Sequence, residues 1–323
     1  MNLIVSPSNN PYTNLATEEL LIKEKREDYL FFYINEPSIV VGKHQIIVSE
    51  INNYFSIMKP VYLARRISGG GTVYHDLGNI NFSVIKNIEE GKGVSYKEIA
   101  TPVVNALNRY NLNIQLSERN DLLYNNLKLS GSAMHIFKNR VIAHGTILFD
   151  TNLTELSDSL KNHRERYTDK AIKSVKSKVC NIKPYAPHIS IDEIIKLISI
   201  EFFIDNKPSD QSALNNEDQE RINQLINQKY VKEEWIYGYS PDYVYKTELK
   251  FENCIAEIEL KVVKSIIKSV EIKHMINNSL KNLMITFLTG KKHIPKILLN
   301  DDEIKELIYT LSLTEMEFIE IFF

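Results

Sequence analysis

The stretch "ARRISGGGTVYHDLGN", residues 64–79, decides how this sequence is interpreted. Three consecutive glycines follow the adjacent pair Arg65 and Arg66, in a chain that holds only 11 glycines among 323 residues. Average glycine usage is roughly twice as high, so the cluster is not compositional noise. A run without side chains lets backbone N–H groups approach a ligand closely, and such a nest of amides typically binds phosphate. The stretch therefore predicts a binding loop for a nucleotide or an acyl phosphate.

Two common glycine motifs are excluded, because neither GxxxxGK[ST] nor GxGxxG is present in the loop. Taken alone, the three glycines are equally well explained by a tight hairpin at a sheet edge. A second stretch, residues 117–150, favours the functional interpretation. It contains Lys128 among small residues, Asp121 seven positions earlier, and the sequence His144-Gly145-Thr146. A lysine there can bring its charge to an anionic centre, and one carboxylate with phosphate oxygens suits Mg²⁺.

Each of these residues also has a structural interpretation. Lys128 alone could be a solvated surface lysine, and His144 alone could be a hydrogen-bonded core histidine. The combination, rather than any single residue, carries the functional hypothesis.

Composition is that of an ordinary soluble protein, with 43% hydrophobic and 25% charged residues and a net charge of −2. That balance does not suggest a nucleic acid as partner. Residues 1–12 lack the basic and apolar regions of a signal peptide, and no run of 18 apolar residues predicts a membrane span. Cys180 and Cys254 form neither a zinc motif nor a disulfide framework. We therefore expect a cytoplasmic monomer that binds no nucleic acid and no membrane.

Strands and helices are mixed over the first 150 residues. β-branched and aromatic runs bounded by turn residues predict strands at residues 30–35, 38–42, 60–68, 80–85 and 140–150. Helices are predicted at residues 14–27 and 95–112, and a capping box from Ser95 to Glu98 opens the second. Because strict βαβ alternation is absent, we expect an α+β fold with a mixed, largely antiparallel sheet and flanking helices.

The second half of the chain is predicted to be helical at residues 189–204, where Ser190 and Glu193 form a capping box, and at residues 215–230. A three-stranded meander over residues 244–275 and two further helices follow. Because that pattern is self-contained, we predict a catalytic domain at residues 1–246 and a small α+β accessory domain at residues 247–323.

Taken together, these stretches resemble the bacterial lipoate–protein ligase A family. Residues 65–79 match its signature RRxSGGGxVxHDxGN at every fixed position. Further blocks follow in family order at residues 14–19, 119–122, 128–133, 144–150, 174–182 and 235–241. The resemblance implies a catalytic domain related to biotin ligases and class II aminoacyl-tRNA synthetases, and a C-terminal accessory domain.

The implied activity has two steps. Lipoate and Mg²⁺-bound ATP give lipoyl-AMP and pyrophosphate, and a specific lysine of an acceptor protein then takes the lipoyl group and releases AMP. The implied acceptors are lipoyl-domain proteins, namely acyltransferase subunits of 2-oxoacid dehydrogenases and the H protein of glycine cleavage.

The resemblance also implies a role for individual residues. Lys128 matches the catalytic lysine, whose charge bridges the lipoyl carbonyl and the α-phosphate, where negative charge develops. Asp121 matches the ligand of Mg²⁺. The implied ATP contacts are Arg66, Gly71, Thr72, Val73, Tyr74 and Lys128. The implied lipoyl-AMP pocket is formed by Ser68, Gly69, Gly70, His75, Asn79, Ala133 and His144.

Two positions depart from the family pattern. His135 stands where many relatives carry arginine, and because histidine is shorter, we expect different contacts in the acyl pocket. Cys180 stands where relatives often have threonine, and we interpret it as a packing residue.

Three alternatives compete with the ligase. An octanoyl- or lipoyl-transferase that forms a thioester needs a cysteine between Gly71 and Lys128, and none is present. A biotin ligase is disfavoured because its GRGRxxR-type loop is missing. A non-catalytic lipoyl-domain-binding homologue would have no use for Lys128, Arg66 and Asp121.

Residues 161–183 form a basic segment, with eight Lys or Arg residues against Glu165 and Asp169, a net charge of +6. Because acceptor lipoyl domains tend to be acidic in this family, we predict that the segment helps to dock them. The alternative is a solvated basic face without a specific partner.

Overall fold

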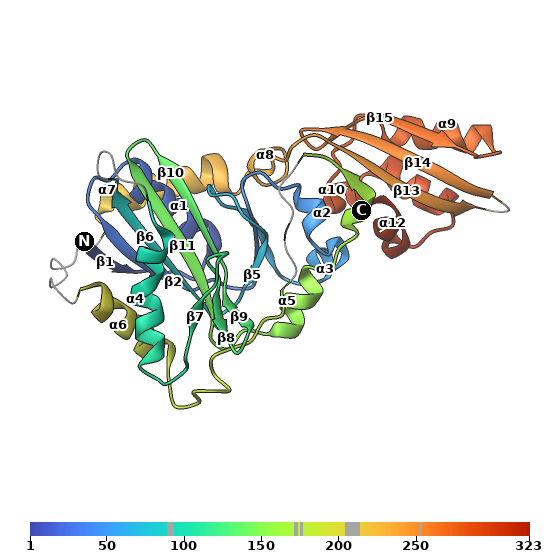
Figure 1. Ribbon diagram of the computed structural model, residues 1–323. Coiled ribbons are helices and arrows are strands. Elements are labelled where there is room, and N and C mark those ends of the chain that lie inside the picture. Colours follow the sequence, from blue (N-terminus) through green and yellow to red (C-terminus); the bar gives the residue numbers. More distant parts are fainter. Residues whose placement is uncertain (89–93, 171–173, 175–176, 204–213, 252–253) are drawn as a thin grey trace. The chain divides into compact units, whose positions relative to one another are not determined.

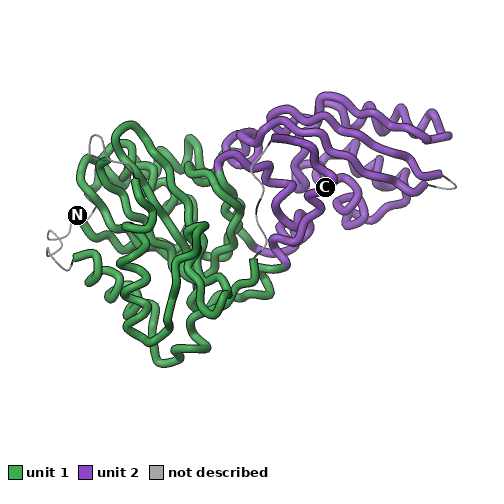
Figure 2. Tube along the Cα trace, in the orientation of Figure 1, with its two compact units in different colours: residues 1–42, 61–157, 174–232 green, residues 43–60, 158–173, 233–323 purple. Residues whose placement is uncertain are grey.

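The computed structural model describes residues 1–88, 94–170, 174, 177–203, 214–251 and 254–323. The chain forms two compact units, each assembled from separate segments (Figure 2). Unit 1 contains residues 1–42, 61–157 and 174–232, and unit 2 contains residues 43–60, 158–173 and 233–323. No helix within the described ranges has the length and apolarity needed to cross a membrane.

The structure divides the chain at a different place from the predicted cut at residue 246. That position lies inside β13 (Tyr243–Phe251), which pairs with β14 (Cys254–Val263) along its whole length. A cut there would break the strand ladder, so the last segment of unit 2 begins earlier, at Glu233. The catalytic and accessory roles of the two parts stay predictions.

The main sheet of unit 1 has the strand order β1-β2-β6-β11-β10. Only the pair β1–β2 is parallel, and the other neighbours are antiparallel. The predicted α+β fold with a mixed, largely antiparallel sheet is therefore confirmed. The strands are β1 (Asn2–Val5), β2 (Tyr29–Tyr33), β6 (Asn79–Asn87), β10 (Ser132–Phe137) and β11 (Arg140–Leu148).

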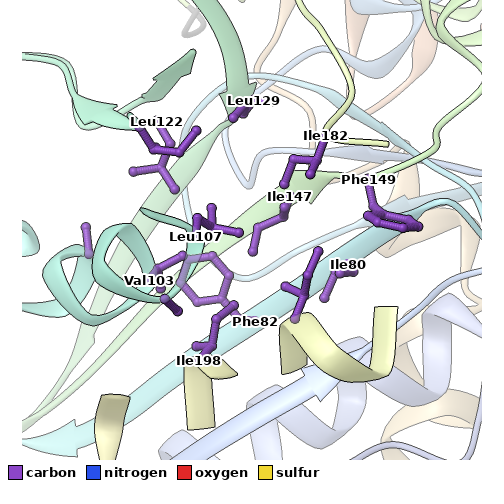
Figure 3. Close-up of a cluster of buried hydrophobic side chains, with 14 of the residues drawn as sticks. Ile80, Phe82, Val103, Leu107, Leu122, Leu129, Ile147, Phe149, Ile182 and Ile198 are labelled. Carbon is purple, nitrogen blue, oxygen red and sulfur yellow. The ribbon is translucent and has the colours of Figure 1, made fainter. Parts of the chain in front are cut away.

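One face of this sheet is apolar. Since side chains alternate along a strand, Ile80 and Phe82 of β6 and Ile147 of β11 share a face. The helices α4 (Tyr96–Asn108) and α6 (Ile191–Phe202) cover it, and their buried side chains join one cluster with the strands (Figures 1 and 3). This cluster is the hydrophobic core of unit 1.

The starts of these two helices test the predicted capping boxes. Ser190 and Glu193 form both reciprocal hydrogen bonds at the start of α6, so that prediction is confirmed. Ser95 occupies the N-cap of α4, but the box with Glu98 is wrong because the serine side chain makes no capping hydrogen bond.

The opposite face of the sheet, called the polar face below, carries buried polar side chains beside apolar ones such as Ile85 and Ile142. Asn81 and Ser83 of β6 lie beside Thr146 and His144 of β11. Helix α1 (Pro11–Lys23) packs here, contacting both strands. Asn10 caps its first turn, and Pro11 begins it in the position where proline is best tolerated. The side chains of α1 and of this sheet face therefore meet in the interior.

Two smaller sheets carry the motif residues. Strands β3 (Ser38–Val41), β4 (Tyr62–Arg65) and β5 (Val73–His75) form the first, and the three glycines connect β4 to β5. The second consists of β7 (Gln115–Leu116), β8 (Leu122–Tyr124) and β9 (Leu127–Ser130). The remaining helical elements of this part are α5 (Leu153–Ser159), α7 (Asn216–Leu225) and the π-helical turn η2 (Ile226–Tyr230).

Asparagine makes many of the turns around the second small sheet. The residues with positive φ there are Asn111, Asn113, Asn120, Asn125 and Asn126, and asparagine tolerates this conformation better than most residues. Glycine is used differently in this chain. A Cβ on Gly42 would lie 2.1 Å from the Gly70 carbonyl oxygen, one on Gly78 2.2 Å from that of Asp150, and one on Gly145 2.7 Å from the Phe82 ring.

Unit 2 is built on an antiparallel sheet of the order β12-β13-β14-β15, with β12 (Tyr167–Thr168) and β15 (Ile266–Lys273) at its ends. The predicted meander is thereby confirmed. Buried His293 accepts or donates hydrogen bonds at both ring nitrogens, to Tyr243 (2.6 Å) and the Phe322 carbonyl (2.7 Å). The helices are α2 (Ile47–Glu50), α3 (Asn53–Met58), η1 (Arg164–Arg166), α8 (Glu233–Ile236), α9 (Asn278–Leu288), α10 (Pro295–Asn300), α11 (Asp302–Thr310) and α12 (Glu315–Phe322).

Candidate active site

The side chain of Arg66 fixes the glycine loop through hydrogen bonds. Its Nε donates to Ser68 Oγ (3.0 Å), and its Nη2 donates to the carbonyl oxygens of Gly69 and Gly71 (2.7 Å each). The remaining nitrogen, Nη1, donates to the Val40 carbonyl at 3.0 Å. A planar guanidinium can make all these bonds at once, which an ammonium cannot. Arg66 therefore shapes the loop from the inside.

Burial lowers the pKa of Arg66 to about 10, although the buried carboxylate of Glu18 opposes that fall. The guanidinium consequently stays positively charged at neutral pH. The positive charge of Arg66 lies next to the backbone of the glycine loop, and it therefore adds to the attraction of the loop for an anion.

The loop leaves its amides available. Gly70 has a φ of +88°, which favours glycine, and a Cβ there would meet Arg66 Nη2 at 3.0 Å and the Ala133 Cβ at 3.5 Å. The N–H groups of Gly69, Gly70 and Gly71 make no hydrogen bond to any described part of the chain. Arg66 thus occupies two loop carbonyls, while neighbouring amides form a nest suited to an anion.

A hydrogen-bonded chain connects the loop to helix α1. Ser68 Oγ lies 2.6 Å from Nε2 of His144, and Nδ1 of His144 lies 3.0 Å from Oε1 of Glu18. The same carboxylate oxygen accepts from Tyr33 (3.0 Å) and Ser83. Burial alone would raise the pKa of Glu18, but interactions with His144, Ser83 and Tyr33 outweigh it and hold that pKa below its usual range. Glu18 is thus a buried carboxylate at neutral pH.

His75, at the end of β5, has a different environment. Its Nδ1 lies 3.0 Å from Nδ2 of Asn35, and its Nε2 is buried with no hydrogen-bond partner among the described residues. Burial, reinforced by the charge of Arg66, lowers the pKa of His75 to about 3. His75 is therefore neutral at neutral pH.

The segment predicted to hold the nucleotide is fixed by hydrogen bonds of its main chain and of its side chains. The N–H of Thr72 donates to Ser174 Oγ at 3.0 Å, and the hydroxyl of Tyr74 donates to Glu155 on α5 at 2.8 Å. Val73 lies between them in β5, which pairs with β3. Asn79 begins β6, bonds Asn81 at 3.1 Å, and keeps its buried Oδ1 without a partner in the described chain.

Lys128 lies on β9 with its ammonium 3.0 Å from Oδ1 of Asp121. A Cβ on Gly131 would be 3.5 Å from Nζ of Lys128, so the side chain extends over bare backbone. Its main chain is fixed on both sides, because Lys128 N donates to the Lys178 carbonyl (2.9 Å) and Cys180 N donates to the Lys128 carbonyl (3.1 Å). The lysine thus has a rigid base and a partly exposed charged end.

Two groups of predicted residues are therefore assembled. Ser68 and Gly70 meet His144 and Ala133, which are cross-strand partners on β11 and β10. Lys128 meets Asp121 over Gly131, and the Gly131 carbonyl accepts from Thr146 N at 3.0 Å, two residues beyond His144. The strands β10 and β11 link both groups within unit 1.

Comparison with known proteins decides the family. The model of the lipoyl protein ligase A/B catalytic domain matches residues 10–203. The chain belongs to the lipoyl protein ligase A/B family. It is 37% identical over 272 residues to lipoate–protein ligase 1 of Staphylococcus aureus, and the match covers 82% of this chain and 83% of the relative.

Solved structures share the fold of this lipoyl protein ligase. A crystal structure of lipoate–protein ligase A bound with ATP has a TM-score of 0.64 and 26% identity, covering 74% of this chain and 98% of that one. A putative lipoate protein ligase from T. acidophilum with bound lipoic acid has a TM-score of 0.63 and 25% identity, covering 73% and 98%. The predicted family, fold and enzyme type, a lipoate–protein ligase, are confirmed.

Pattern-based prediction missed three residues of the ligase site, namely Glu18, Asn35 and Ser174. Glu18 had a visible signal, since it lies in a helix whose neighbouring residues are almost all apolar or small. Its partner His144 is 126 positions away, so no local pattern could connect the two. Asn35 had no signal of its own in a chain rich in asparagine, whereas Ser174 begins the family block at residues 174–182.

The two departures from the family pattern lie in different settings. Cys180 joins the core cluster, in agreement with a packing role, and burial raises the pKa of its thiol. His135 lies on β10 opposite Ile142, one strand position beyond Met134. Its side chain is partly buried.

The basic segment of the ligase carries less free charge than its composition suggests. Arg164 pairs with Glu50 (3.2 Å) and Asp169 (2.6 Å), and Lys183 donates to the Ile189 carbonyl at 3.1 Å. Lys178 is exposed, whereas Lys173 and Lys176 lie outside the described residues.

Proposed function

We propose that this chain joins lipoate to a protein lysine in two steps at one site. In the first step, a carboxylate oxygen of lipoate attacks the α-phosphorus of ATP, and pyrophosphate leaves. In the second step, the neutral amine of the acceptor lysine attacks the acyl carbon, the bond to the phosphate oxygen breaks, and AMP leaves. The observation that carries the proposal is the presence in unit 1 of a nest of free amides, in the loop between β4 and β5, together with the ammonium of Lys128 on β9.

The glycine loop and Lys128 have complementary roles. Negative charge gathers on the acyl oxygen and the α-phosphate in both steps, and fixed donors stabilise it without reorganising during the reaction. We assign the amides of Gly69 and Gly70 to the acyl carboxylate and the ammonium of Lys128 to the bridging position. No protein nucleophile is required, because the anhydride is already activated and only has to be positioned for the amine.

The nucleotide is assigned to the main chain of Gly71, Thr72, Val73 and Tyr74. Arg66 shapes the loop that holds ATP, because its Nε, one hydrogen of its Nη1 and both hydrogens of its Nη2 bond protein oxygens. Its fifth N–H, on Nη1, is assigned to the direct contact with ATP that the family resemblance implies.

The acyl group is assigned to a pocket bordered by the predicted residues around the loop. Two unpartnered, buried polar atoms support a polar ligand group there: Nε2 of His75 and Oδ1 of Asn79. Ser68, Ala133 and His144 complete the wall that the loop faces.

Mg²⁺ fits the site as an ion that arrives with ATP. Within the described ranges, no three His, Cys, Asp or Glu side chains gather as a ready-made metal cage. Asp121 supplies a single carboxylate beside Lys128, and Mg²⁺ in nucleotide sites is held by one or two carboxylates together with phosphate oxygens. When bound, the ion would neutralise part of the phosphate charge.

The acceptor is assigned to the class of lipoyl domains, including those of 2-oxoacid dehydrogenase acyltransferase subunits and the glycine-cleavage H protein. We propose that the protein works as a cytoplasmic monomer. Residues 161–183 remain the proposed docking segment. Changing Lys173, Lys176 and Lys178 to Glu is expected to raise the acceptor KM and to leave lipoate-dependent ATP–pyrophosphate exchange unchanged. An unchanged acceptor KM would discard the docking role.

The decisive experiment is mass spectrometry of an apo-lipoyl domain incubated with the protein, lipoate and ATP. We expect the mass of one lipoyl group to be added by the wild type and not by Lys128→Ala. Lys138→Ala, which removes an exposed lysine elsewhere in unit 1, is the matched control and should retain activity. A folded wild type that gives neither modification nor lipoate-dependent ATP–pyrophosphate exchange, yet binds the lipoyl domain, would point to the non-catalytic homologue.

A further inference from the structure

We infer that Asn35 and Glu18 determine which ring nitrogen carries the hydrogen in the two histidines of the site. Asn35 contacts His75 and Glu18 contacts His144, and the result is opposite in the two rings. Asn35 makes His75 carry its hydrogen on Nε2, where it serves as a hydrogen-bond donor to an oxygen of the ligand. Glu18 makes His144 carry a hydrogen on Nδ1, directed away from the glycine loop. The assignment of ring hydrogens rests on geometry, and only its effect on catalysis rests on the proposed function.

The argument for His75 starts at a backbone carbonyl, which can only accept. Asn14 Nδ2 lies 2.9 Å from the Ser8 carbonyl and 2.8 Å from Oδ1 of Asn35. The first contact identifies this atom of Asn14 as the amide nitrogen, and the second therefore identifies the facing atom of Asn35 as oxygen. The other end of Asn35, which lies 3.0 Å from Nδ1 of His75, is then its NH₂ group.

An NH₂ group can only donate, so Nδ1 of His75 must accept and carries no hydrogen. The hydrogen of the neutral ring is therefore on Nε2. This atom is buried and has no partner within the described residues, and His75 itself is only 3% exposed. A buried donor without a partner costs free energy, which a ligand oxygen would recover. Ser6 completes the chain by donating to Oδ1 of Asn14 at 2.6 Å.

The argument for His144 starts at a carboxylate, which also can only accept. Oε1 of Glu18 lies 3.0 Å from Nδ1 of His144, so Nδ1 carries the hydrogen. Ser68 Oγ already accepts from Arg66 Nε at 3.0 Å, and its own hydrogen is free to donate to Nε2 of His144 at 2.6 Å. Every hydrogen in the chain from Arg66 to Glu18 then points away from the loop.

The two chains therefore differ in direction. The chain from Ser6 to His75 ends in an N–H group on Nε2 of His75 that can donate to a ligand. In the chain from Arg66 to Glu18, each donor already has a protein acceptor, and the chain orients Arg66. Hydrogen bonds aligned in this way polarise one another in a low-dielectric interior. Asn35 and Glu18 act through the histidines, and we therefore describe both as positioning residues.

The first test is a spectroscopic reading of the ring hydrogens. The full chain, labelled with ¹⁵N-histidine and kept at pH 7.5 without ligand, is examined by long-range ¹H–¹⁵N correlation NMR. His75→Gln and His144→Gln spectra assign the two signals. We expect His75 to show a protonated Nε2 and a bare Nδ1, and His144 to show a protonated Nδ1 and a bare Nε2. A protonated Nδ1 at His75 or a bare Nδ1 at His144 overturns the inference.

The second test reverses one direction. Asn35→Asp keeps the acceptor for Asn14 but replaces the NH₂ group with an oxygen that can only accept. We expect the His75 signal to gain a hydrogen on Nδ1. The matched control is Asn9→Asp, at an exposed asparagine that bonds the Ile34 carbonyl, and it should leave both histidine signals unchanged. Unchanged His75 signals in folded Asn35→Asp overturn the inference.

Catalysis supplies a separate reading. With Asn35→Asp, we expect the KM for lipoate in ATP–pyrophosphate exchange to rise about tenfold, as for a misdirected hydrogen bond to a charged group, while Asn9→Asp keeps the wild-type value. An unchanged KM overturns the catalytic part of the inference. If the wild type shows the expected ring hydrogens but no lipoate-dependent exchange, the proposed function fails and the assignment of Asn35 and Glu18 stands.

Discussion

On β11, Ala143 and Ile147 face the core beneath α4 and α6, whereas His144 and Thr146 between them face α1. On the central strands β6 and β11 both faces are largely buried, so solvent exposure does not distinguish them there. The apolar face is held by contacts without direction. On the polar face, each donor must meet an acceptor, because an unpaired buried group costs about 1–3 kcal/mol. The apolar face thus mainly stabilises unit 1, whereas the polar face orients the side chains of the site.

The largest effect is expected on the apolar face. Phe82→Ala removes a ring that is fully buried beneath Gly145, and such deletions typically cost about 3–5 kcal/mol in the free energy of unfolding. Urea denaturation measures the loss. Ser83→Ala, one residue along on the polar face, is the matched comparison and should cost about 2 kcal/mol, because its hydroxyl bonds the carboxylate of Glu18. Equal losses at the two positions would mean that the faces do not differ as described.

Arg66→Lys should affect activity more than stability. Lysine keeps the charge but cannot bond Ser68, Gly69 and Gly71 together, so the nest of amides loses its shape. We expect the rate of lipoyl transfer to fall about 100-fold, which corresponds to about 2.7 kcal/mol. Steady-state kinetics checks this, with Arg26→Lys at an exposed position as the control. A loss below about threefold would contradict the assigned role of Arg66.

Acid should lower the free energy of unfolding, because His75 is buried in its neutral form. The pKa of His75 falls to about 3 in the folded state, whereas an unperturbed histidine titrates near pH 6.5. The unfolded chain therefore binds more protons between these values, and the free energy of unfolding decreases as the pH falls through that window. From pH 6.5 to 5, His75 should contribute a loss of about 2 kcal/mol.

Urea denaturation at both pH values measures that loss, and His75→Gln should remove its share. Buried His293 in unit 2, whose pKa burial lowers to about 4, provides a second group with the same sign of dependence. His293→Gln is thus the matched variant outside the site. An identical pH dependence in wild type and His75→Gln would refute the buried, neutral state of His75.

The smallest effect is expected at the edge of the nucleotide segment. Ser174→Ala removes the acceptor of the Thr72 N–H, and loss of one such bond is worth about 1 kcal/mol. We expect the KM for ATP to rise about fivefold while the KM for lipoate stays the same. Ser177→Ala, at an exposed serine close by, is the control. If both serine variants bind ATP like the wild type, Ser174 does not order this segment.

Local patterns predicted β2, β6 and β11 of the large sheet, the helix start at Ser190 and the glycine loop, but not the strands β1 and β10. These features depend on neighbouring residues, as alternation along β6 illustrates. The interleaving of the two units was not predictable in this way, because residues 43–60 belong to unit 2 together with segments that begin only at residues 158 and 233. The capping box at Ser95 failed because a matching pair of residue types does not guarantee the hydrogen bonds.

The site was predictable to the extent that it lies in signature stretches. The residues that direct it are different, since Glu18 and Asn35 act only through partners that folding brings to them. The one visible sign for Glu18 was its place among apolar residues in the family block at residues 14–19. It indicates an interior partner without revealing which residue that partner is.

Asparagine occupies many turns with positive φ in this chain, whereas several glycines lie where a Cβ has no space. The second group sets a lower limit on the number of glycines that this fold needs. Asn120 and Asn125 have positive φ, a conformation that glycine also adopts readily, so the backbone there accepts either residue. Gly42, Gly78 and Gly145 are excluded from such an exchange, because any side chain would collide with neighbouring atoms. Glycines can therefore be replaced by asparagine in turns of this kind, but not at such points of close contact.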